Sequence, residues 1–295
     1  HFKKCSKDAG KILQSEKQDL NYYYKQYSIE QERENFEEQF GGRRSTTHLQ
    51  EVSDSLDTFF MASKLKQSCT VFSYEQVFKH KYDIHLTDEV LALLQRKNVP
   101  SMLVQLYRFG LLTMTEPENE DNYLQLKKLL QQNLNLEPSE ERNLHVLGQN
   151  YCIRNVNKGK TKYFTELFEL YKLGLEKEVI QSDRSQFPPA FKNIVSTGLK
   201  VKEYEWVENF IYEYSDLIAE DSQADYKNFN LARLCFDQQR YKEAKQFLQD
   251  VEFKDLFVTL NARLLLTKTY YELDQMDLLE HQLKSFEHFV SRQKN

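Results

Sequence analysis

The chain has 295 residues, with only five prolines and eight glycines, and its formal net charge is −5. So little proline and glycine excludes a turn-rich β architecture, and the abundance of Leu, Gln, Glu, Lys and Tyr predicts an almost wholly helical protein. The acidic balance argues against a nucleic-acid binder, and because no stretch approaches about 18 continuous apolar residues we expect no membrane contact through a transmembrane helix.

Four cysteines, Cys5, Cys69, Cys152 and Cys235, lie isolated within helical patterns. Their scattered placement favours buried, reduced thiols over a disulfide framework. No secretory signal pattern is present either. These features predict a cytoplasmic protein.

The first 80 residues predict polar helices around one joint. Residues 6–40 have the thin apolar stripe of one or two charged helices, and Gly41–Gly42 opens a flexible joint. The next helix is expected to begin near Ser53–Asp54, which are good N-caps. We expect a second helix to follow it, with the hairpin closed around Thr70–Ser73.

Helix-start signals then recur at short intervals. Thr87 is a candidate N-cap, and Pro100 is placed to start the helix that follows. Pro117 and Pro138 mark two further breaks, and Pro188–Pro189 opens the carboxyl-terminal part. Such frequent breaks give every helix an antiparallel neighbour.

A repeat is clearest over Asp225–Val251, where two amphipathic helices flank a polar corner. Its second helix carries Tyr241-x-x-Ala244. The same pattern recurs 35 residues downstream as Met276-x-x-Leu279 and 37 residues upstream as Tyr204-x-x-Val207. Periods of this length with two helices per unit indicate a stack of helical hairpins.

These residues resemble the tetratricopeptide repeat, which pairs a large residue with a small one, here Leu231–Ala232, before a turn and an aromatic-x-x-Ala pattern. Gln239–Arg240 stands at the turn where the family often has glycine, and the repeat lacks the terminal proline. The whole chain is also similar to uncharacterised bacterial helical-repeat proteins. The resemblance implies an all-α, right-handed α–α superhelix, a solenoid of antiparallel hairpins. We divide it into an N-terminal polar segment (1–50), divergent hairpins (51–187) and repeats (188–295).

The resemblance further implies that the first helices line a concave groove that holds a peptide or protein. Aromatic rings beside Arg and Lys suit an extended peptide with acidic groups. The predicted groove residues are Lys192, Tyr226, Phe229, Arg233, Phe236, Lys268 and Tyr271. The alternative for Phe229, Phe236 and Leu264 is a place in the core between repeats.

Other sequence patterns give only weak evidence for a phosphate, metal or catalytic site. Gly159–Lys160–Thr161 looks like the end of a phosphate-binding loop, but Arg154 stands where its first glycine would be. His281 and His288 lie about 10 Å apart along one helix, too far to share a metal ion. We find no catalytic constellation and expect no enzyme, cofactor or metal. The sequence favours a non-catalytic protein-interaction scaffold, and the alternative is a helical-repeat regulator that binds nucleic acid or a signalling peptide.

The last helix carries an apolar stripe with only five residues after it. The stripe consists of Leu279, Leu283, Phe286, Phe289 and Val290. A solenoid normally ends with a polar capping helix. Three explanations stay open: the stripe packs inward, the protein continues beyond this sequence, or the stripe pairs with a second copy to form a homo-oligomer.

Overall fold

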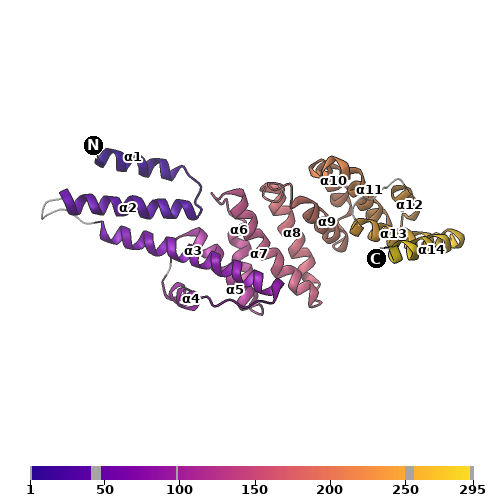
Figure 1. The fold of residues 1–295 in the computed structure, drawn as a ribbon, viewed down its shortest axis with the longest axis horizontal. Coiled ribbons are helices and arrows are strands. Elements are labelled where there is room, and N and C mark those ends of the chain that lie inside the picture. The colour runs from indigo at the N-terminus through magenta and orange to yellow at the C-terminus, as the bar shows by residue number, and fades with distance from the viewer. Residues whose placement is uncertain (1, 41–47, 98, 250–255, 293–295) are drawn as a thin grey trace. The chain divides into compact units, whose positions relative to one another are not determined.

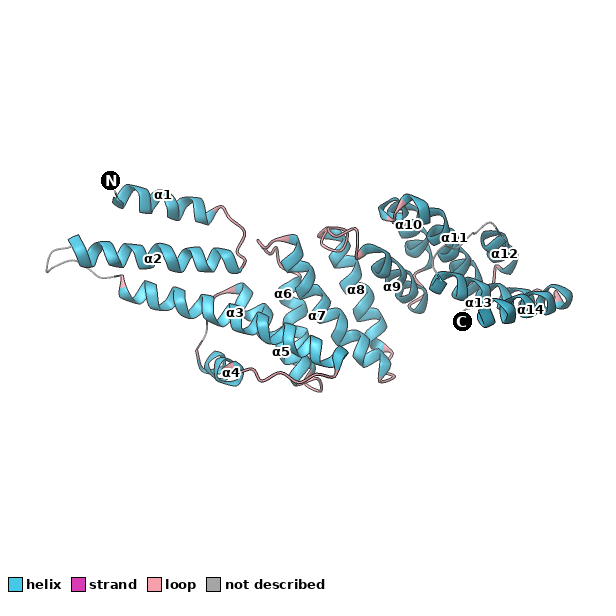
Figure 2. Ribbon diagram, viewed as in Figure 1, coloured by secondary structure: helices cyan, strands magenta, loops and turns pink. Residues whose placement is uncertain are grey.

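The computed structural model describes residues 2–40, 48–97, 99–249 and 256–292. These residues form fourteen α-helices and one short 3-10 helix, with no strand among them (Figure 2). The prediction of an all-α chain is therefore confirmed. The predicted joint at Gly41–Gly42 lies outside the described residues. The chain divides into unit 1, His1–Tyr163 with Lys172–Val179, and unit 2, Phe164–Tyr171 with Ile180–Asn295.

Unit 1 is built from helices of 10 to 30 residues. They are α1 (Phe2–Gln14), α2 (Leu20–Phe40), α3 (Leu49–Phe78), α4 (Thr87–Arg96), α5 (Met102–Thr115), α6 (Glu120–Leu130), α7 (Pro138–Asn157) and parts of α8 (Lys162–Glu176). α2 lies beside both α1 and α3 (Figure 1), and α5 contacts α3, α6 and α7. The predicted N-terminal segment 1–50 thus belongs to the same unit as the helices that follow it.

The helix starts predicted near Asn119 and Pro138 agree with the structure, whereas α5 begins at Met102, with Ser101 as its cap, and leaves Pro100 outside the helix. The Ser101 hydroxyl accepts a hydrogen bond from the Val104 amide at 3.3 Å, and the Asn119 side chain accepts one from the Asp121 amide at 3.2 Å. Both bonds satisfy amides that have no partner within their own helix. Pro138 occupies the first turn of α7, where its missing amide costs nothing.

Three predictions in the first 90 residues are wrong. The hairpin expected around Thr70–Ser73 does not exist, because α3 runs unbroken from Leu49 to Phe78, and its start also precedes the expected Ser53–Asp54. The hydroxyls of Thr70 and Ser73 donate to carbonyls one turn back, at 3.1 and 2.8 Å, so these polar residues are satisfied inside the helix. Thr87 is not the cap of α4: Leu86 is, and the buried Thr87 hydroxyl bonds Ser68 at 2.9 Å.

Unit 2 consists of shorter helical hairpins. Its elements are α9 (Phe187–Lys200), α10 (Tyr204–Tyr214), a 3-10 helix (Ser215–Leu217), α11 (Glu220–Asp237), α12 (Tyr241–Gln249), α13 (Leu256–Glu272) and α14 (Met276–Arg292). α11 contacts both α9 and α13, so the first helices of successive hairpins lie side by side. α11 begins five residues before the stretch that the repeat pattern marked.

One type of turn closes four hairpins. A residue in the left-handed region ends the first helix each time: Gly159 (φ 82°), Lys202 (φ 63°), Gln239 (φ 62°) and Asp274 (φ 55°). Two hydrogen bonds satisfy the last carbonyls; in the third hairpin they run from Gln239 N to Phe236 O at 2.9 Å and from Arg240 N to Cys235 O at 2.8 Å. The last three turns are 37 and 35 residues apart, which are the spacings that the sequence pattern predicts.

Small residues set the distance between paired helices. A side chain at Gly198 of α9 would place its Cβ 2.3 Å from a methyl group of Val207 in α10. Ala232 of α11 and Ala244 of α12 are fully buried in the same way. The paired helices therefore approach closely, as the sequence predicts for the two alanines.

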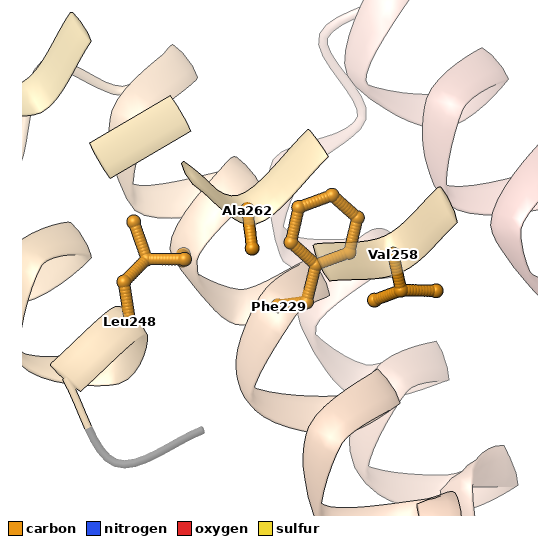
Figure 3. Close-up of a cluster of buried hydrophobic side chains, with 5 residues drawn as sticks. Phe229, Leu248, Val258 and Ala262 are labelled. Carbon is orange, nitrogen blue, oxygen red and sulfur yellow. The ribbon is translucent and has the colours of Figure 1, made fainter. Parts of the chain in front are cut away.

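A compact apolar cluster joins α11, α12 and α13. Phe229 lies in it with Leu248, Val258 and Ala262 (Figure 3). Phe229 is only 7% exposed, and Ala232 completes the cluster. This burial ties the third hairpin to the fourth.

The left-handed turn residues provide a test of the shared turn. Gln239→Gly should raise the free energy of unfolding by about 1 kcal/mol, because glycine adopts φ 62° without the steric cost that a side chain has there. The matched control is Gln238→Gly: at φ −83° glycine relieves no steric cost but loses more conformational entropy on folding than glutamine, so this variant should destabilise. Urea denaturation of both variants checks this expectation, and a loss of stability in Gln239→Gly would contradict it.

The cluster in Figure 3 provides a second test. Phe229→Ala should cost about 3–5 kcal/mol, because it removes a buried ring and leaves a cavity between three helices. Tyr271→Ala, at a side chain that is 63% exposed, should change stability by less than about 0.5 kcal/mol. Thermal and urea unfolding measure both; equal losses would mean that Phe229 does not hold the hairpins together.

Candidate functional site

A shallow cavity of about 280 Å³, here called the C-terminal hollow, lies where α11, α13 and α14 meet. Its walls are Phe236, Thr267, Lys268, Tyr271, Glu272 and Leu279. Three of the predicted groove residues, Phe236, Lys268 and Tyr271, therefore come together. Lys268 is exposed and has no ion-pair partner among the described residues, so its charge is available to a ligand.

Arg233 lies one turn before Phe236 on α11, but it connects helices instead of facing an open groove. Its guanidinium donates to the Ser196 hydroxyl of α9 at 2.8 Å and to the Asn230 side chain at 3.1 Å. The guanidinium also lies over the Phe229 ring, 5.7 Å from its centre. Burial lowers the pKa of Arg233 from its usual value. The Arg233 guanidinium therefore makes its hydrogen bonds within the protein.

The remaining predicted groove residues lie apart from the hollow. Phe229 lies in the core, so the prediction that it lines the groove is wrong. Its place is the one given by the alternative, in the core between repeats. Tyr226 is half-buried and packs against the same cluster. Lys192 is half-buried on α9, and its carbonyl accepts from the Ser196 hydroxyl at 2.6 Å. Leu264 is 44% exposed and belongs to neither the core nor the hollow.

A second cavity, of about 320 Å³, lies in unit 1, and sequence reasoning missed it. It is lined by residues of α3, α5 and α7: Lys66, Cys69, Thr70, Ser73, Tyr74, Tyr107, Asn143, Val146, Leu147 and Asn150. The side chains of Asn143 and Asn150 are exposed and make no hydrogen bond with the described residues. Because three separate helices contribute to this α3–α5–α7 hollow, no single stretch of sequence indicates it.

A buried carboxylate anchors the α3–α5–α7 hollow. Glu140, 6% exposed, accepts hydrogen bonds from Lys66 of α3 and from the Tyr107 hydroxyl of α5. Burial and the Glu140 charge raise the pKa of Tyr107. Burial likewise raises the pKa of the Cys69 thiol, whose Sγ contacts the Tyr107 carbonyl at 3.6 Å. The thiol is therefore a poor nucleophile, and the cluster serves to join three helices.

A third cavity, of about 540 Å³, is larger but has mixed charge. It surrounds the start of α11 and is lined by Arg184, Asp216, Leu217, Ile218, Ala219, Glu220 and Gln223. Asp216 accepts a hydrogen bond from Gln223 there. Carboxylates at the amino end of a helix already satisfy its dipole, so this cavity has little affinity left for an anion.

The basic cluster between α7 and α8 makes most of its polar contacts within unit 1. Lys158 and Lys160 pair with Glu118, at 2.6 and 3.6 Å. Lys162 pairs with Glu120 at 2.7 Å, and Arg154 donates to the Thr113 carbonyl at 2.9 Å. These contacts hold the α7–α8 turn against α5 and α6.

The glycine turn at residue 159 is also unsuited to phosphate. The amides of Gly159 and Lys160 donate to carbonyls of α7, at 2.8 and 3.0 Å, so neither is free to bind a ligand. A phosphate-binding loop needs such amides and a preceding strand. Within the described residues, no three His, Cys, Asp or Glu side chains gather as metal ligands.

His145 of α7 is the most isolated titratable group in unit 1. Its side chain is fully buried, and neither ring nitrogen has a hydrogen-bond partner among the described residues. The Glu141 carboxylate lies 4.0 Å from Nε2, but it is paired with Lys177 at 2.8 Å. Burial, with a smaller contribution from Lys177, lowers the pKa of His145 from 6.5 to about 4.

Across the described part of the chain, none of the helices is both long enough and apolar enough to cross a lipid bilayer. Comparisons with family models, curated proteins and solved structures found no match to this chain.

The burial of His145 predicts an acid-dependent loss of stability. The pKa is lower in the folded chain than in the unfolded one, so the stability present above pH 6.5 is lost as the pH falls towards 4. Between pH 7 and pH 5 the unfolding free energy should fall by about 2 kcal/mol more in the natural chain than in His145→Leu. Urea titrations at both pH values measure this, and parallel losses in the two proteins would contradict it.

Proposed function

We propose that the chain is a non-catalytic protein-interaction scaffold, a right-handed superhelix of tetratricopeptide-like hairpins, that binds a peptide or protein segment at the C-terminal hollow. The observation that carries the proposal is the meeting of Phe236, Lys268 and Tyr271 around one cavity. The recurring turn and the side-by-side placement of α9, α11 and α13 support the repeat architecture. A solenoid of this kind offers its first helices as a binding surface.

The hollow favours a peptide with an apolar side chain next to an acidic group. Phe236 and Leu279 provide apolar walls, and the Tyr271 ring is exposed at the rim. Lys268 supplies the available positive charge. Aromatic residues beside a cation are typical of binding surfaces in which a few side chains carry most of the affinity.

The alternative functions have less support. Nucleic-acid binding would need a continuous positive surface, and the cations at residues 154–162 are paired with unit 1 groups. Catalysis would need an accessible nucleophile or a paired acid and base, whereas Cys69 and Tyr107 have raised pKa values and are buried. A scaffold in the cytoplasm remains the function that we propose.

Self-association through α14 also stays a prediction. Its stripe is partly covered, since the Arg263 guanidinium lies 4.7 Å from the centre of the Phe289 ring. Leu283 remains 49% exposed. A second copy would therefore find only the middle of the stripe open.

Selection of peptides from a random library on the intact chain tests the binding proposal. Peptides that bind at the hollow should lose at least about tenfold in affinity with Tyr271→Ala and with Lys268→Ala, because these substitutions remove an exposed ring and the available charge. Fluorescence anisotropy of the selected peptides measures the loss.

The control is Tyr212→Ala, which removes a tyrosine of α10 that is 50% exposed and outside the hollow. Affinity should be unchanged in this variant. The proposed site is wrong if the selected peptides bind Tyr271→Ala and Lys268→Ala as tightly as the natural chain. It is also wrong if their affinity falls only with Val146→Asp in the α3–α5–α7 hollow.

A further inference from the structure

The long helix α3 carries an exposed seam at the spacing of a coiled coil. Residues of the seam alternate at intervals of four and three over the whole helix: Leu49, Ser53, Leu56, Phe60, Ser63, Gln67, Thr70, Tyr74 and Val77. This 4-3 spacing places them in one row that a second helix can cover. Among the described residues, nothing covers this row fully: every member is exposed except Ser63, which is half-buried.

The apolar members of the seam are unusually exposed. Leu49 is 61% exposed, Leu56 43%, Phe60 42%, Tyr74 52% and Val77 72%. Helices α2 and α4 pack on other faces of α3, as the Tyr24–Phe59 ring contact at 5.5 Å and the Ser68–Thr87 hydrogen bond show. Five exposed apolar side chains in one row, at both ends of a helix about 42 Å long, are typical of an interface.

We propose that the α3 seam pairs with α3 of a second copy, in an antiparallel arrangement, to form a homodimer. In this register Phe60 faces Ser63 of the second copy, so the largest side chain at the centre meets the smallest. Leu56 then faces Gln67, and Leu49 faces Tyr74. The same contacts are repeated by the two-fold symmetry, which makes the surface self-complementary.

Charge selects the antiparallel direction. Asp57 and Lys64 flank the seam on the same side, seven residues apart, and so about 10 Å from each other within one helix. Asp57 is exposed and pairs with no described residue. The Lys64 ammonium donates a hydrogen bond to the seam residue Gln67 at 3.1 Å and forms no ion pair among the described residues. In the antiparallel register each Asp57 lies opposite Lys64 of the second copy, giving two ion pairs.

The parallel register fits less well. It would place Ser63 against Ser63 and Gln67 against Gln67, which leaves gaps and polar groups at the centre. Asp57 would then lie opposite the aliphatic Val52 and not a cation. Size and charge therefore both favour the antiparallel pair.

Charge exchange tests the proposal on the full chain. Sedimentation equilibrium should show a dimer whose dissociation constant rises about tenfold in Asp57→Lys and in Lys64→Asp, since each substitution places like charges together. The double variant D57K/K64D should recover the natural affinity. Circular dichroism and thermal unfolding must show the same fold in all four proteins.

Two further variants separate the seam from other surfaces. Phe60→Glu should give a monomer, because it places a charge at the centre of the seam. Leu283→Glu, in the exposed part of α14, should leave the dimer unchanged. A natural chain that is monomeric at every concentration, or a dimer that is lost with Leu283→Glu and kept with Phe60→Glu, would overturn the proposal.

Cross-linking determines the direction of the pair. In a background of Cys5→Ser, which removes the one exposed thiol of the described residues, a short bis-maleimide should link copies that carry both Leu49→Cys and Tyr74→Cys. These two positions are about 37 Å apart within one helix, so the link can form only between copies. Efficient linking of Leu49→Cys alone would mean a parallel pair and would contradict the proposal.

Discussion

Four of the hairpins depend on a turn that ends one helix and starts the next within about four residues. The left-handed residue at Gly159, Lys202, Gln239 or Asp274 directs two amides back to the last carbonyls of the first helix. This satisfies backbone groups that would otherwise need water or side chains, and it fixes the antiparallel approach of the second helix. Close packing at Gly198, Ala232 and Ala244 is possible only after the turn has set that approach.

The sequence predicts the elements well where a local cause determines them. Pro138 and Asn119 act within one helical turn, so their effect is visible in the sequence itself. The break expected at Thr70–Ser73 fails for the opposite reason. A polar run is a poor signal for a helix end when its hydroxyls can donate to carbonyls one turn earlier.

The candidate site shows why groove and core residues are hard to distinguish from a repeat pattern. Phe229 and Phe236 are both aromatic residues of α11, seven positions apart and hence on nearly the same face. Phe229 is covered because α12 and α13 meet beside it, whereas Phe236 lies where α13 and α14 leave a cavity. That difference depends on how successive hairpins are placed, and the sequence of a single helix does not indicate that placement. Glu140 is a similar case, since its partners come from two other helices.

The two units differ in the length of their longest helices and in how much helix surface stays exposed. In unit 2 the helices from α9 onward have 9 to 18 residues, and the C-terminal hollow among them carries one cation, Lys268, that pairs with no described residue. In unit 1, α3 has 30 residues and extends past the helices that pack on it. A helix this long presents more surface than α2, α4 and α5 together can cover. Its uncovered face is apolar at both ends and polar in the middle, and that distribution resists indiscriminate aggregation while it still suits one specific register of association.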